Sequence, residues 1–107
     1  MPEAVIVSTA RTPIGRANKG ALVECRPDDL SAFIIGEILS KSGIDGSLIE
    51  DVIWGCAMPE GSQGLNVARL AVLRARLPVE VPAVTVNRFC SSGLQTIAMG
   101  AQAIMSG

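Results

Sequence analysis

Short apolar runs alternate along the chain with stretches in which apolar residues recur at helical spacing. The first run, residues 4–8 (AVIVS), is continuous, short and rich in valine and isoleucine. Such a run is typical of a strand buried inside a sheet. Residues 52–57 (VIWGCA) and 83–87 (AVTVN) have the same character. The pattern therefore predicts three strands, over residues 4–8, 52–57 and 83–87.

A long loop and a helix separate the first two predicted strands. Residues 11–26 contain proline, glycine and asparagine at positions that break regular structure. Pro27 then opens a helix, and the acidic pair Asp28 and Asp29 complements the positive end of that helix. Gly43 stands where a C-terminal cap belongs. We predict a helix over residues 27–42, followed by a short helical turn near residues 45–50.

Two further helices follow the second and third predicted strands. Asn66 is a suitable cap for a helix that begins at Val67. The last helix, over residues 91–107, carries no charged residue. A helix without a charged face is normally buried on most sides. A chain of 107 residues is too short to bury it so completely, so we expect this helix to pack against residues outside the sequence.

The order β-α-β-α-β-α predicts an α/β domain with a largely parallel sheet and right-handed crossovers. Composition sharpens this picture, because 49% of the residues are hydrophobic and only 18% are charged. That is too apolar for a disordered chain. It is also rich in core residues for a domain of this length, which must expose much of its surface. The sequence thus predicts one incomplete domain.

Charge and cysteine content exclude several classes of function. Nine Lys and Arg residues against ten Asp and Glu give a net charge of −1, which argues against a nucleic-acid module. No apolar run approaches the roughly 18 residues of a membrane span. Glu3 and the lack of a basic leader argue against a secretory signal, so we expect a cytoplasmic location. The three cysteines show no C-x-x-C spacing and the chain has no histidine, so we expect no metal site.

Cys90 lies directly between the third predicted strand and the last predicted helix. This position presents a side chain at the carboxyl end of the sheet and at the positive end of a helix, and both features favour a thiolate nucleophile. Backbone N–H groups in the first turn of a helix are free to bind a developing oxyanion. The alternative is that Cys90 is a small buried core residue. We interpret Cys56 as a core residue and Cys25 as an incidental exposed thiol.

Four segments carry a resemblance to a known family. Residues 86–95 (VNRFCSSGLQ) closely resemble the nucleophile signature of the thiolases, the acyl-CoA C-acyltransferases. Residues 10–15 (ARTPIG), 55–60 (GCAMPE) and 63–69 (QGLNVAR) resemble three further thiolase segments, in the family's order. The resemblance implies the front part of the N-terminal thiolase-fold half, a layered α/β structure with a largely parallel mixed sheet. Residues 1–107 would be a partial domain that ends after the nucleophile helix.

The resemblance also implies a reaction and its partners. The Cys90 thiolate would attack a 3-ketoacyl-CoA and keep the acyl group as a thioester, with its own backbone N–H as an oxyanion donor. Free coenzyme A would then accept the acyl group, and the reverse reaction would join two acetyl-CoA molecules. Coenzyme A is a substrate here, and no cofactor is implied. The implied partners are acyl-CoA and CoA, the remainder of the chain, and further copies in a homodimer or homotetramer.

The chain departs from the thiolase pattern in what it lacks. Thiolases use two histidines and a second cysteine, which lie in later segments, and a loop region that holds most of coenzyme A. We therefore expect the 107-residue chain to be inactive by itself. Two other interpretations remain open. One is a ketoacyl synthase-like condensing enzyme, which also places a cysteine at a strand-to-helix turn. The other is a non-catalytic partner subunit of a thiolase.

Overall fold

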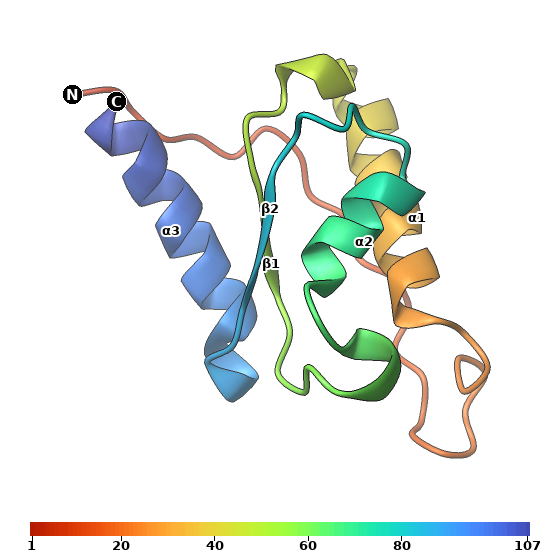
Figure 1. Ribbon diagram of the computed structural model, residues 1–107. Helices are drawn as coiled ribbons and strands as arrows, with labels where there is room; N and C mark the ends of the chain where they lie inside the picture. The colour runs from red at the N-terminus through yellow and green to blue at the C-terminus, as the bar shows by residue number, and fades with distance from the viewer.

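The computed structural model describes residues 1–107 and arranges three helices around a small sheet. Helices α1 and α2 cover one face of the sheet and α3 covers the other (Figure 1). The elements are, in chain order, α1 (Pro27–Ser42), β1 (Val52–Gly55), α2 (Val67–Arg74), β2 (Ala83–Val86) and α3 (Ser92–Ser106). Three short 3-10 turns accompany them, at Gly46–Leu48, Gly61–Gln63 and Phe89–Ser91.

The sheet consists of β1 and β2, which pair in parallel. Val52 lies opposite Ala83, and Gly55 lies opposite Val86. Helix α2 forms the crossover between the two strands, as parallel pairing requires. The predicted α/β class with a parallel sheet is therefore confirmed, and both strands fall inside the predicted segments 52–57 and 83–87.

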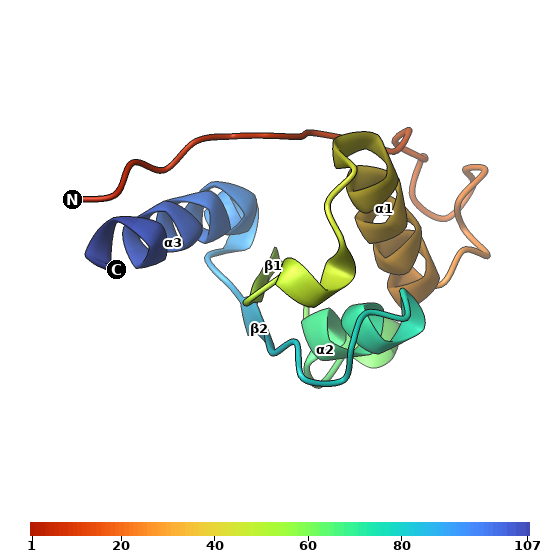
Figure 2. The same ribbon diagram turned by 90° about the horizontal axis from the view of Figure 1, so that it is seen from above.

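The predicted first strand, residues 4–8, does not form. This segment is extended but has no strand partner, and it crosses the molecule apart from the sheet (Figure 2). Val5, Ile6 and Val7 are 67%, 74% and 70% exposed. A continuous apolar run is stable as a strand when strands flank it and layers cover both faces. The two strands of this sheet do not supply that environment.

The predicted ends of α1 are confirmed. Pro27 is its first residue, and Gly43 ends it in the left-handed conformation with φ of 72°. The guanidinium of Arg26 donates two hydrogen bonds to the Asp28 carboxylate, at 3.0 and 2.9 Å. These bonds hold the pKa of Asp28 below its usual value. The predicted turn after α1 is also present, as the 3-10 turn Gly46–Leu48.

The hydrophobic core lies between α1, α2 and the sheet. It is formed by five buried residues, Ile35, Ala71, Val72, Leu77 and Val81. Helix α3 adds none of its apolar side chains to this core, and Ser92 is its only buried residue. Leu94 and Ile97 are 72% and 61% exposed. As predicted, these 107 residues do not bury the last helix on most sides, and they leave one of its apolar faces uncovered.

Polar side chains pin the start of α2 to β2. Asn66 caps α2 by accepting a hydrogen bond from the backbone N–H of Arg69, as predicted. The same oxygen accepts from the Thr85 hydroxyl at 2.6 Å. The Arg69 guanidinium donates to the carbonyls of Val81 and Val79, at 2.6 and 2.9 Å. This arginine thus holds the chain between α2 and β2 in place.

Replacing Arg69 tests whether its hydrogen bonds to the Val79 and Val81 carbonyls stabilise the fold, a contact that we call the brace. We expect Arg69→Ala to lower the free energy of unfolding by about 1.5–3 kcal/mol, because hydrogen bonds from a charged donor are lost. The matched control is Arg74→Ala, which removes the exposed ion pair with Asp29 and should cost far less than Arg69→Ala, because solvent screens an exposed pair. Chemical denaturation measures both, and equal losses for the two variants would contradict the brace.

Candidate functional site

Cys90 lies in the short connection between β2 and α3. Strand β2 ends at Val86, the 3-10 turn Phe89–Ser91 contains Cys90, and α3 begins at Ser92. Its thiol is free and exposed. This is the predicted position between a strand and a helix, and the exposure disagrees with the alternative of a buried core residue. Cys56 is buried at 6% exposure, in agreement with its interpretation as a core residue.

The backbone turns sharply just before the thiol. Phe89 has φ of 50°, in the left-handed region that non-glycine residues rarely adopt. Its backbone N–H donates to the side-chain oxygen of Asn87 at 2.8 Å. Such a conformation persists only where surrounding interactions hold it, and it is common at functional sites. The turn redirects the chain within a few residues and leaves Cys90 at the surface.

The backbone N–H of Cys90 takes part in no hydrogen bond within the chain. The N–H groups that follow are occupied, because Ser91 donates to the carbonyl of Arg88 and Ser92 donates to that of Phe89. The free N–H lies just before the 15-residue helix α3. The first turns of helices attract anions through their unpaired N–H groups and the helix dipole. One residue thus carries both an exposed thiol and a backbone N–H without a partner in the chain.

The end of β1 fixes the start of α3. A Cβ atom added to Gly55 would lie 2.9 Å from the carbonyl carbon of Ser92 and 3.0 Å from the nitrogen of Gly93. Any side chain at residue 55 would therefore collide with the backbone of α3. Glycine permits this approach, and the contact seats the turn that carries Cys90 on the sheet.

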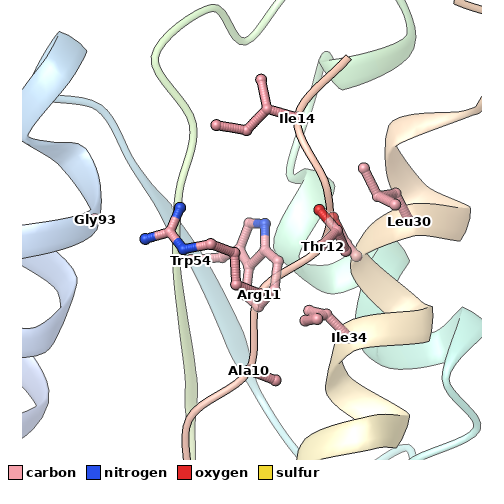
Figure 3. Close-up of a pocket in the computed structure, with 9 residues that line it drawn as sticks. Ala10, Arg11, Thr12, Ile14, Leu30, Ile34, Trp54 and Gly93 are labelled. Atoms are coloured by element: carbon pink, nitrogen blue, oxygen red, sulfur yellow. The ribbon is translucent and has the colours of Figure 1, made fainter. Parts of the chain in front are cut away.

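A cavity of about 500 Å³ lies between the loop before α1, helix α1, strand β1 and the start of α3. Figure 3 shows Arg11 and Thr12 from the loop before α1, Trp54 from β1, and the backbone of α3 at Gly93. Leu30 and Ile34 of α1 complete its apolar side. Three of the four segments that carry the family resemblance meet around the start of α3, namely residues 10–15, 55–60 and 86–95.

The arrangement places an exposed thiol next to an N–H group without a partner in the chain, and it includes no imidazole base, because the chain has no histidine. The sequence interpretation did not single out two residues that shape the turn, Asn87 and Ser92. Asparagine readily accepts a hydrogen bond from the N–H two residues ahead, so Asn87 carried a signal for this turn. Ser92 carried a weaker one, because serine at a helix start usually caps the helix, whereas this serine is the first helical residue.

Comparison with known proteins agrees with the motifs. The family model described as "Thiolase, N-terminal domain" matches residues 4–107. The whole chain aligns with the 3-ketoacyl-CoA thiolase of Bacillus subtilis (strain 168) at 57% identity, and covers 27% of that protein. It aligns with the 3-ketoacyl-CoA thiolases of Vibrio vulnificus (strain YJ016) at 48% and Yersinia enterocolitica at 45% identity, and covers 28% of each. The chain thus spans just over a quarter of these relatives.

The contact at Gly55 can be tested with a matched pair of glycine variants. We expect Gly55→Ala to lower the free energy of unfolding by about 1–3 kcal/mol, because the start of α3 must shift. Gly36→Ala is the control, since Gly36 lies inside α1 with open space around it. That change should raise stability by about 0.5–1 kcal/mol. Chemical denaturation compares them, and a neutral or stabilising Gly55→Ala would contradict the close approach.

Proposed function

Because the chain belongs to the thiolase family, we propose that it is part of an acyl-CoA C-acyltransferase and that Cys90 is the acyl-accepting nucleophile. One observation carries the proposal. The exposed thiol and the free backbone N–H of Cys90 lie together in a strained turn at the start of α3. This turn belongs to the segment that resembles the thiolase nucleophile signature.

In the proposed reaction, the thiolate attacks the ketone carbon of a 3-ketoacyl-CoA. The carbonyl oxygen becomes an oxyanion and accepts a hydrogen bond from the Cys90 N–H. The carbon–carbon bond then breaks, its electron pair leaves with acetyl-CoA, and that carbanion takes up a proton. The acyl group remains on Cys90 as a thioester until the thiol of coenzyme A, losing its proton, attacks it and releases the thiolate. The reverse sequence joins two acetyl-CoA molecules.

The remaining proton transfers require groups outside these 107 residues. A general base must lie within hydrogen-bonding reach of the proton it moves, and this chain holds no histidine. The proposal therefore assigns the base and most of the coenzyme A site to the rest of a longer protein. The 107-residue chain alone should show no thiolysis. The proposal also includes a cytoplasmic location. Three free cysteines are compatible with that reducing compartment.

We expect the rest of the longer protein to pack against the uncovered face of α3, which is called here the proposed seat. It includes Leu94, Ile97, Ile104 and Met105, all at least 43% exposed. A homodimer or homotetramer is the assembly that the family resemblance implies, and size-exclusion chromatography of the complete protein tests it. None of the helices combines the length and the hydrophobicity that a membrane-spanning helix needs.

Alkylation and acylation mapping should identify the nucleophile. In the complete protein we expect iodoacetamide to modify Cys90 faster than the exposed Cys25. Cys90→Ser should lower kcat for thiolysis by at least about 10³-fold, because the thioester no longer forms. Cys25→Ser is the control and should retain activity. Full activity of Cys90→Ser, with equal alkylation of both thiols, would overturn the assignment.

The same assay separates the two rival functions. A condensing enzyme of the ketoacyl synthase type would join malonyl-derived units and fail to cleave 3-ketoacyl-CoA with free coenzyme A. A non-catalytic partner subunit would show neither reaction, even in the complete protein. Thiolysis that depends on Cys90 is the result that the proposal expects.

The proposed seat on α3 gives a stability test. In the complete protein, Ile97→Asp should lower the free energy of unfolding by about 3 kcal/mol or more, because it buries a carboxylate among apolar groups. Ser40→Asp, at an exposed position in the last turn of α1, is the control and should cost no more than about 1 kcal/mol, the scale of an acid's interaction with the helix dipole. A loss for Ile97→Asp no larger than the control's would show that this face stays in water.

A further inference from the structure

Ser92 is the buried polar residue at the turn that carries Cys90. It is 4% exposed. Its hydroxyl donates a hydrogen bond to the carbonyl of Phe89 at 2.7 Å and accepts one from the backbone N–H of Arg88 at 2.9 Å. The Ser92 side chain therefore binds backbone groups of two successive residues, the N–H of Arg88 and the carbonyl of Phe89. Both capacities of the hydroxyl as donor and acceptor are used.

Asn87 holds the same stretch from the other end. Its side-chain oxygen accepts a hydrogen bond from the N–H of Phe89 at 2.8 Å. Together the two side chains bind the N–H of Arg88, the N–H of Phe89 and the carbonyl of Phe89. These groups flank the φ angle of 50° that Phe89 would otherwise avoid. We call Asn87 and Ser92 the turn clamp.

The neighbouring hydroxyl of Ser91 does not perform this task. It is exposed and donates to the carbonyl of Arg88 at 2.9 Å. That carbonyl already accepts the backbone N–H of Ser91 at 3.1 Å. Loss of the Ser91 hydroxyl therefore leaves no backbone group of the turn without a partner. Ser91 and Ser92 are thus adjacent hydroxyls of different importance, which makes them a matched pair for substitution.

We propose that the turn clamp is a positioning device, in which Ser92 and Asn87 hold the Cys90 thiol and the Cys90 N–H in one fixed relation for acyl transfer. This inference rests on the proposed function. The thiol must reach the ketone carbon while the N–H faces the oxygen of the same group, so both depend on the conformation of Phe89. Without the clamp the turn relaxes toward ordinary backbone angles, and the two groups no longer meet one substrate carbonyl together.

The complete protein provides the test, with Ser92→Ala, Asn87→Ala and the control Ser91→Ala. We expect kcat for thiolysis to fall about 10- to 100-fold in the first two variants, because small misplacements of reacting groups are costly. KM should change far less than kcat in these two variants. Ser91→Ala should retain the activity of the protein without substitutions. The ratio of Cys90 to Cys25 alkylation, read in one sample by mass spectrometry, should fall with kcat. Asn87→Ser, which keeps a weaker acceptor, should recover part of the loss.

Thermal unfolding separates positioning from folding. Asn87 is exposed, so Asn87→Ala should lower kcat while the melting temperature stays near that of Ser91→Ala. If Asn87→Ala and Ser92→Ala retain the kcat and alkylation ratio of Ser91→Ala, the clamp proposal is overturned. It is also overturned if kcat falls only in Ser92→Ala and only as far as its stability does. Absence of acylation at Cys90 in the unmodified protein would instead overturn the proposed function, and the positioning role with it.

Discussion

The contact between Gly55 and the start of α3 is the constraint on which the site depends. Parallel pairing sets Gly55 opposite Val86, so β1 and β2 end at the same level. The chain must then leave β2, reverse within a few residues, and return against the backbone of residue 55. Within that path Phe89 adopts the left-handed conformation. The location of Cys90 thus depends on the register of β1 and β2 and on the lack of a side chain at Gly55.

Features governed by neighbouring residues were predictable from the sequence. Pro27 begins α1, Gly43 ends it and Asn66 caps α2, because each acts on backbone groups only a few residues away. The two strands of the sheet and the turn at Cys90 were predictable for a related reason. Each apolar run is bounded by residues that stop it, and the crossover rule then orders the elements.

Features governed by distant residues were not predictable. Residues 4–8 have the composition of a strand, but strand formation needs a hydrogen-bonded neighbour, and the segment stays outside the sheet. The absence of charge on α3 did predict that these residues leave an apolar face of the helix exposed, but it could not show what covers that face. The role of Ser92 was missed for the same reason, because its importance comes from the reversal of the chain and the approach of β1.

Under the proposed function, the uncovered apolar face of α3 and the missing catalytic base belong to the same region of the molecule. Cys90 precedes the helix whose apolar face is uncovered, and Leu94 on that helix lies four residues after the nucleophile. A segment that covered α3 would remove water from the surroundings of the thiol, which would strengthen the proposed interaction of the Cys90 N–H with an oxyanion. It would also bring new side chains within reach of the thiol, where this chain has no histidine to act as a base. The contacts that complete the core are therefore also the ones that would complete the catalytic site.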